Sequence, residues 1–380
     1  MRVVIVGAGV GGLGLARGLR DVGSEVVVLE RHEAPNTGGA AVTLYSNGSA
    51  ALDRLGIDIA DCGAPIAALE VRRASGAVAM RADLTRMEAR FGFGVRTVPR
   101  RDLLSRLGAG DPGAVRYGQR VVEVIAEGPA VRTADGEVHE GDVVVGADGH
   151  RSIVRAAVLD PRPAAAVGWT TWQGLTPVLP EIAQGRTGVL TVGPAGLVGT
   201  MPAGDGLCQW WFDVRGEASG EAPLDTLRAA FAGYAEPVPE LLRSITREDV
   251  EGFPHVLHEV RPRWGTGAVT LLGDAAHASP PSQAQGANQA LEDAWVFRQA
   301  LAPGVNGTDV ASRLRSAERL RADRLRLVSH MAASERTNKP ASPLLALLTG
   351  RIPPSVTGSA YARLVKRFSS VLNDEAVTAT

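Results

Sequence analysis

The sequence predicts an α/β fold with a Rossmann-like unit and a helical C-terminal segment. Short β-branched runs alternate with helical patterns along the chain, and glycine-containing turns follow three of these runs, near residues 7, 146 and 273. A long amphipathic helical pattern follows residue 311. At roughly 150 residues per domain, the chain is long enough for two to three domains.

The composition excludes several classes of protein. Apolar residues make up 45% of the 380-residue chain and the net charge is −1, so no global field would attract a nucleic acid. The two cysteines, Cys62 and Cys208, are too few for a disulfide framework or a metal quartet, which favours a reducing compartment. No stretch is long and apolar enough for a membrane span. We therefore expect a cytoplasmic protein with no metal, no nucleic-acid partner and no membrane partner.

The N-terminal segment has the pattern of a dinucleotide-binding unit. The β-branched run at residues 2–6 leads into Gly7-Ala8-Gly9-Val10-Gly11-Gly12 and a helical stretch, and a second run at residues 26–29 ends at Glu30. In this G-x-G-x-x-G pattern the first glycine allows a tight turn. The second lets the backbone approach a pyrophosphate, and the third lets the helix pack on the sheet. We expect the helix N-terminus to bind phosphate and Glu30 to bind the ribose.

A second strand-and-turn segment lies at residues 142–155, DVVVGADGHRSIVR. Its β-branched run, residues 143–145, ends in a turn that contains Asp148 and Gly149, with Ser152 and Arg155 at helical spacing. A carboxylate in this position lies at the carboxyl edge of a parallel sheet, where ligands bind in open α/β folds.

A third such segment lies at residues 268–294, AVTLLGDAAHASPPSQAQGANQALEDA. Its strand, residues 269–272, is followed by Gly273 and Asp274, and after two prolines Gly286-Ala287-Asn288 opens a helix. The free N–H groups at that helix start favour an electron-rich acceptor.

Together these segments resemble the group A flavoprotein monooxygenases, the para-hydroxybenzoate hydroxylase family. The N-terminal unit is similar to that family's FAD fingerprint, and the two downstream segments are similar to its D-G and G-D motifs. Smaller similarities lie at residues 39–56, at residues 100–103 and in the Arg-rich helix of residues 315–336. The resemblance implies cofactor contacts by Gly7, Gly9, Val10, Gly11, Gly12, Glu30, Arg31, Asn47, Arg100, Val122, Asp148, Gly149, Gly273, Asp274, Pro281, Gly286, Ala287 and Asn288.

The resemblance also implies the chemistry. In this family NADH or NADPH reduces bound FAD, reduced flavin adds O2 to give a C4a-hydroperoxide, and one oxygen is transferred to the substrate. We therefore expect an NAD(P)H-dependent monooxygenase that hydroxylates a small or medium-sized planar, aromatic molecule. The flavin performs the reaction, while the protein positions it and excludes water.

One loop departs from the family pattern. Many members have a phenylalanine and a G-Q-G sequence after the two prolines, whereas this chain has Ser282 and, in place of the first glycine, Ala284. We expect this to reshape the wall beside the flavin without preventing FAD binding, because the following helix start is intact.

The resemblance implies a discontinuous Rossmann-like FAD-binding domain with an inserted β-sheet substrate domain, and it divides the chain into three parts. The FAD-binding domain comprises residues 1–65, 96–165 and 262–300, the substrate-binding sheet comprises residues 66–95 and 166–261, and residues 301–380 form C-terminal helices. The sheet segments are rich in strand formers. The candidates for lining the substrate pocket are His255, Trp172, Trp210 and Phe212.

Several alternatives remain open from the sequence. The same flavin chemistry serves epoxidation and Baeyer–Villiger oxidation. A non-catalytic escort-type protein that binds a dinucleotide or a prenyl group could share the fold. No substrate-activating base is identified, since a lone histidine such as His255 or His258 is more often structural, and His277 is expected to be architectural. The choice between NADH and NADPH, and between a monomer and a homodimer, is likewise open.

Overall fold

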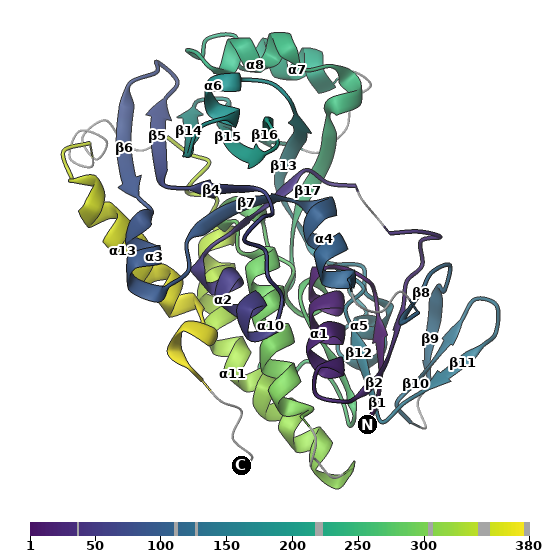
Figure 1. Cartoon of the computed structure of the whole chain (residues 1–380). Coiled ribbons are helices and arrows are strands. Elements are labelled where there is room, and N and C mark those ends of the chain that lie inside the picture. Colours follow the sequence, from purple (N-terminus) through teal and green to yellow (C-terminus); the bar gives the residue numbers. More distant parts are fainter. Residues whose placement is uncertain are drawn as a thin grey trace.

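The structure is a computed structural model that describes residues 1–35, 38–109, 113–125, 128–216, 223–302, 307–340 and 350–375. Two large sheets dominate it, with a parallel sheet below and a mixed sheet above in the view of Figure 1. Parts of the expected C-terminal helical segment, residues 303–306, 341–349 and 376–380, lie outside the described residues.

The five-stranded parallel sheet has the strand order β18-β12-β1-β2-β8. Strands β1, β12 and β18 are apolar runs that are almost fully buried, as expected when helices cover both faces of a parallel sheet. The strand bounds are β1 Arg2–Val6, β2 Glu25–Leu29, β8 Val115–Arg116, β12 Val143–Gly146 and β18 Val269–Leu271. The helices of this half are α1 Val10–Arg20, α2 Ser46–Arg54, α4 Arg100–Gly108, α5 Ile153–Val158, α9 Asp274–His277 and α10 Gly286–Ala300.

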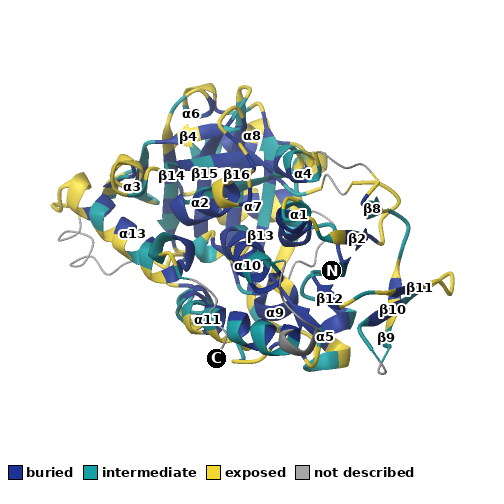
Figure 2. Ribbon diagram, turned by 60° about the horizontal axis from the view of Figure 1, so that its bottom comes forward, coloured by how far each residue is buried: buried dark blue, intermediate teal, exposed yellow. Residues whose placement is uncertain are grey.

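Helix α10 is the central element of this half of the molecule. It packs against α1, α2 and the long helix α11, Gly307–Ala333. Most of its residues are buried, and Figure 2 shows it surrounded by other elements. A helix enclosed in this way has to satisfy its polar residues internally, which it does through the network described below.

The seven-stranded sheet has the order β17-β13-β16-β15-β14-β5-β6. One of its faces is covered by α7 and α8, and the other lies toward the parallel-sheet half (Figure 1). The elements are β5 Ala68–Arg73, β6 Val78–Asp83, β13 Ala165–Thr176, α6 Pro180–Ala183, β14 Thr187–Gly193, β15 Gly196–Gly204, β16 Leu207–Arg215, α7 Pro223–Ala230, α8 Val238–Ser244, the 3-10 turn η1 Arg247–Asp249 and β17 Glu251–Leu257.

The remaining strands form two small sheets. The sheet β3-β7-β4 lies between the two halves, and the meander β9-β10-β11 projects beside β8 in Figure 1. The bounds are β3 Ala41–Leu44, β4 Ala64–Ile66, β7 Val95–Pro99, β9 Val121–Ile125, β10 Ala130–Thr133 and β11 Val138–Glu140, with helix α3 at Thr85–Phe91.

The C-terminal part is helical where it is described. Helix α13, Pro354–Phe368, packs against β6 and α3, and the 3-10 turn η3, Val371–Asn373, packs against α2. A second 3-10 turn, η2 Pro281–Gln283, lies against α11. No described helix is long and apolar enough to cross a membrane.

Candidate active site

The three glycine-containing turns begin side by side. Val6, Gly146 and Leu271 end adjacent parallel strands in one row of the sheet. One further hydrogen bond extends each pairing past the strand ends, from Ala147 N–H to the Val6 carbonyl at 2.7 Å and from Leu272 N–H to the Gly146 carbonyl at 2.9 Å. Gly146 lies 140 residues and Leu271 lies 265 residues after Val6 in the sequence, yet all three reach the same carboxyl edge, where open α/β sheets bind ligands.

A cavity of about 400 Å³ opens at this edge. The sequence-predicted residues that line it are Gly7, Gly9, Glu30, Arg31, Arg100, Val122, Asp148 and Gly149. Sequence reasoning missed four polar residues that also line it, namely His32, Gln119, Arg120 and Arg151. His32, next to Glu30, and Arg151, within the D-G segment, could have been suspected from their places in the sequence. Gln119 and Arg120 lie between β8 and β9, where the sequence has no recognisable pattern.

The glycines of the first turn have different spatial roles. A Cβ at Gly7, whose φ is +106°, would lie 2.4 Å from the carbonyl oxygen of Ala147. A Cβ at Gly12 would lie 2.1 Å from the Gly7 carbonyl oxygen, so both positions are restricted by the fold itself. A Cβ at Gly9 would meet no atom within 4 Å. Gly9 therefore leaves its backbone open to the cavity, as the approach of a pyrophosphate requires.

The Glu30 carboxylate is fixed at the cavity wall. Its Oε2 accepts from the Ala8 N–H at 2.8 Å, and its Oε1 accepts from the His32 N–H at 3.1 Å and lies 2.5 Å from His32 Nδ1. Burial raises the pKa of Glu30, but these hydrogen bonds outweigh it and hold the pKa below the usual value. Glu30 is therefore ionised at neutral pH and able to accept a ribose hydroxyl.

The D-G motif holds its carboxylate by local hydrogen bonds. Asp148 Oδ2 accepts from the Ile153 N–H at 2.8 Å, while Oδ1 is buried and has no partner among the described residues. Burial raises the pKa of Asp148. A buried carboxylate oxygen without a partner is costly, and a ribityl or ribose hydroxyl would supply the missing donor. This open acceptor, together with the bare backbone at Gly9, fits a dinucleotide such as FAD.

Arg155 connects two of the motifs. Its Nη1 donates to the carbonyls of Ala275 and Ala276 at 3.2 and 3.0 Å, which ties α5 to α9. His277, at the end of α9, lies with Nε2 2.6 Å from Asp293 Oδ2, both groups being buried. These contacts are structural, and they leave the Asp274 side chain at the start of α9 exposed.

The start of α10 forms a second part of the site. Because Gly286, Ala287 and Asn288 form the first turn, their N–H groups have no intrahelical partner. Among the described residues no side chain caps this helix either. With the positive end of the helix dipole, they form an acceptor site for negative charge. The side chains of Asn47 and Asn288 are buried in contacts with the protein. Asn288 bonds the Tyr45 N–H and the Thr43 carbonyl, each at 2.9 Å.

The loop that departs from the family pattern has its own geometry. Ala284 adopts the left-handed conformation, with φ +48° and ψ +36°, a backbone that glycine adopts without strain. The Ser282 hydroxyl donates to the Ala332 carbonyl at 3.0 Å, and Thr337 Oγ1 donates to the Ser282 carbonyl at 3.3 Å. The loop is therefore attached to the end of α11.

The structure does not support three of the aromatic pocket candidates. Trp210 and Phe212 are fully buried in the cluster between the seven-stranded sheet and helices α7 and α8, and Trp172 packs against the same cluster. The opposite face meets the parallel-sheet half, where Gln209 Nε2 donates to the Ala41 carbonyl at 3.0 Å. Successive strand residues alternate between faces, so Trp211 and not its neighbours lies on the face toward the site.

His255 is on that face but is not a free base. It is 1% exposed, its Nδ1 lies 2.6 Å from Glu335 Oε1, and its Nε2 lies 2.7 Å from Thr171 Oγ1. Burial alone lowers the pKa of an imidazole, but the Asp213 and Glu335 carboxylates outweigh it and raise the pKa of His255 to about 9. The ring is therefore protonated at neutral pH, with both nitrogens occupied.

Comparison with known proteins identifies the family. Residues 1–332 match the FAD binding domain family. This chain belongs to the group A flavoprotein monooxygenases. A urate hydroxylase of Klebsiella oxytoca is 32% identical over 86% of this chain and 87% of the relative. A 3-amino-4-hydroxybenzoate 2-monooxygenase of Streptomyces platensis is 34% identical over 88% and 87%.

A solved structure agrees with this assignment. Klebsiella pneumoniae HpxO, complexed with FAD and uric acid, superposes with a TM-score of 0.80 at 26% identity over 99% of this chain and 95% of that chain. The chain is thus an FAD-dependent oxidoreductase that uses NAD(P)H and O2. Because these relatives are enzymes, the alternative hypothesis of a non-catalytic escort protein is rejected.

Proposed function

We propose that this flavin monooxygenase hydroxylates a planar aromatic or heteroaromatic small molecule between the start of α10 and the facing side of the seven-stranded sheet. The observation that supports this is the apolar and aromatic character of that side. Trp211 and Leu190 pack there against a cluster that contains Met201. Side chains of this character suit contact with a flat, apolar ring. The named relatives act on urate and on an aminohydroxybenzoate, which are molecules of this kind.

The chain's own residues would hold and shield FAD, which supplies electron transfer and O2 activation when bound. The backbone at Gly9 and the N-terminus of α1 would bind the pyrophosphate. Glu30 and Asp148 would accept hydrogen bonds from sugar hydroxyls. The N–H groups of Gly286, Ala287 and Asn288 would stabilise negative charge on the reduced ring.

Neither His255 nor His258 is poised as the substrate's base. His255 is protonated and occupied, and His258 Nε2 donates to the His150 carbonyl at 3.0 Å. Burial lowers the pKa of His258. We infer that a phenolic substrate would lose its proton to water or bind already ionised, which makes the reaction faster as the pH approaches the substrate's own pKa.

The test uses purified holoenzyme with anaerobic stopped-flow spectroscopy. NADH or NADPH should bleach the flavin absorption slowly alone and faster with a matching aromatic compound, tested from urates and aminohydroxybenzoates. On admitting O2, the product should contain one oxygen atom from 18O2. Reduction that no aromatic compound accelerates, with all O2 recovered as hydrogen peroxide, would refute the proposal.

We further propose a cytoplasmic location, a monomeric or homodimeric state, and the domain division given above. The seven-stranded sheet is built from residues 68–83 and 165–257, which supports the expected inserted segments. Sedimentation of the holoenzyme would measure the oligomeric state.

A further inference from the structure

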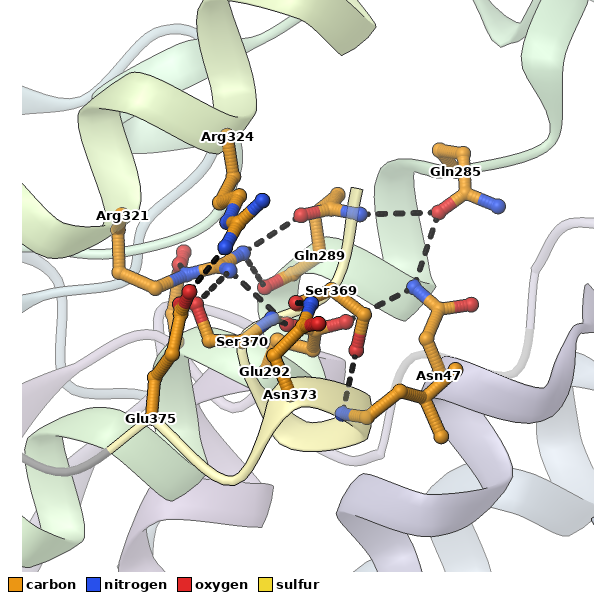
Figure 3. Close-up of polar contacts among 12 residues, drawn as sticks. Asn47, Gln285, Gln289, Glu292, Arg321, Arg324, Ser369, Ser370, Asn373 and Glu375 are labelled. Atoms are coloured by element: carbon orange, nitrogen blue, oxygen red, sulfur yellow. Dashed lines mark hydrogen bonds and ion pairs between the residues drawn. The ribbon is translucent and has the colours of Figure 1, made fainter. Parts of the chain in front are cut away.

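Arg321, on the inner face of α11, is fully buried and uses its whole guanidinium (Figure 3). Its Nε donates to Asp293 Oδ1 at 2.7 Å, and its Nη1 donates to Glu292 Oε2 at 2.9 Å and to Ser370 Oγ at 3.1 Å. Its Nη2 donates to the side chain and the backbone carbonyl of Gln289, at 2.6 and 3.3 Å. A guanidinium has five N–H donors, and all five are engaged here.

The first branch leads to the G-D turn. Asp293, which accepts from Arg321 through Oδ1, accepts through Oδ2 from the Gly273 N–H at 2.9 Å and from His277 at 2.6 Å. Burial raises the pKa of Asp293, but His277 and Arg321 outweigh it and lower the pKa. The carboxylate is therefore charged and holds both ends of α9, with Gly273 beside the exposed Asp274.

The second branch leads to the start of α10. Gln289 Nε2 donates to Gln285 Oε1 at 2.9 Å, and Asn47 Nδ2 donates to the same oxygen at 3.1 Å. Gln285 is the residue that precedes the first turn of α10, so its position sets where the N–H groups of that turn point. Figure 3 shows Gln285, Gln289 and Arg321 joined in this order.

The third branch closes the network with α2 and the C-terminal segment. Glu292 accepts from Asn47 Nδ2 at 3.0 Å through Oε1 and from the Ser370 N–H at 2.6 Å through Oε2. Arg321 thus reaches α9 through Asp293, the start of α10 through Gln289, and α2 through Glu292, all by buried groups. Such a network has one satisfied arrangement, because every alternative leaves a buried polar group without a partner.

We propose that Arg321 is a positioning residue for FAD, which fixes the G-D turn and the first turn of α10 relative to each other. The G-D turn bonds α10 through the Asp293 carboxylate. Arg321 orients that carboxylate and also holds Gln289, which bonds Gln285 at the start of the helix. The proposal rests on the assignment of these two segments to FAD and not on the identity of the substrate. A lysine could replace the charge but not the five donors or the planar fork.

The test compares Arg321→Lys with Arg326→Lys, a matched control on the same helix whose exposed guanidinium bonds only Asp323 among the described residues, at 2.7 Å. The readouts are the dissociation constant of FAD, followed by flavin fluorescence, and the two-electron midpoint potential of bound FAD. For Arg321→Lys we expect FAD to bind about ten- to a hundredfold more weakly. The affinity for reduced FAD should fall further than the affinity for oxidised FAD. Each tenfold difference between these two losses of affinity lowers the midpoint potential by about 30 mV.

A second variant covers the case in which Arg321→Lys fails to fold. Gln289→Met keeps the side-chain volume and the charges of the network and removes the amide that links Arg321 Nη2 to Gln285 Oε1. It should lower the potential while the control does not. If the Arg321 or Gln289 variant melts earlier yet binds FAD with unchanged affinity and potential, Arg321 is a structural residue only and the proposal is overturned.

Discussion

The imidazole of His255 on β17 and the carboxylate of Glu335 beyond α11 face each other at 2.6 Å, and both side chains are shielded from water. Thr171 Oγ1 bridges the ring to Asp213, and Asn338 Nδ2 donates to the second Glu335 oxygen at 2.7 Å. A protonated imidazole fits this series of hydrogen bonds, because it can donate from both of its nitrogens. The contact therefore joins the seven-stranded sheet to the segment that also bonds the flavin loop through Thr337.

This ion pair predicts a pH-dependent stability. The pKa of His255 is raised from 6.5 to about 9 in the folded protein, so its stabilisation is complete below about pH 6.5 and is lost as the pH rises toward 9. The loss should amount to about 3 kcal/mol of unfolding free energy. Urea denaturation of the wild type and of His255→Gln at about pH 6 and about pH 10 measures it. An equal pH response in both proteins would contradict the prediction.

The bare backbone at Gly9 predicts a variant that folds but does not bind flavin. Because a Cβ there meets no protein atom, Gly9→Val should leave the thermal midpoint of the apoprotein nearly unchanged. The added methyl groups would occupy the path of the pyrophosphate, so FAD should bind about a hundredfold more weakly or not at all. Gly108→Val, at another position open to solvent, is the control and should remain yellow. Tight FAD binding by Gly9→Val would disprove the fingerprint assignment.

The alternation of faces on β16 predicts opposite consequences for neighbouring tryptophans. Trp210→Leu removes a fully buried ring from the cluster beside α7 and α8 and should cost about 3 kcal/mol of stability, with KM unchanged. Trp211→Leu should raise KM for the aromatic substrate while costing less stability. The Trp211 indole lies on Gly199, where a Cβ would come within 2.1 Å of the ring. Equal effects of the two variants on KM would show that the facing side of the sheet does not bind substrate.

The left-handed residue in the flavin loop predicts that a glycine is tolerated there unusually well. Ala284→Gly removes a conformational cost of about 1 kcal/mol and adds an unfolded-state entropy cost of similar size, so stability should be unchanged or slightly higher. Ala229→Gly, at an exposed position inside α7, should instead lose about 1 kcal/mol. Chemical denaturation of both variants checks this. A comparable loss in both would mean that Ala284 is not held in the left-handed conformation.

The sequence predicted those parts of the fold in which local pattern and backbone geometry coincide. The β-branched runs before Gly7, Gly146 and Gly273 are strands β1, β12 and β18, and the helix expected after Gly286 is α10. Glycine spacing and hydrophobic period depend on neighbours in the chain, so they are visible without a three-dimensional structure. The family and the FAD chemistry followed from the same local motifs.

The tertiary structure decided what depends on long-range packing. Which face of β16 meets the flavin half cannot be read from LCQWWFDV, because alternation gives two faces and only the position of α7 and α8 assigns them. The role of His255 depends on Glu335, which is 80 residues away. Arg321 resembles any other arginine of its helix in the sequence, and only burial beside Asp293 and Gln289 distinguishes it. Desolvation and partner charges determine such roles, and both exist only once the chain has folded.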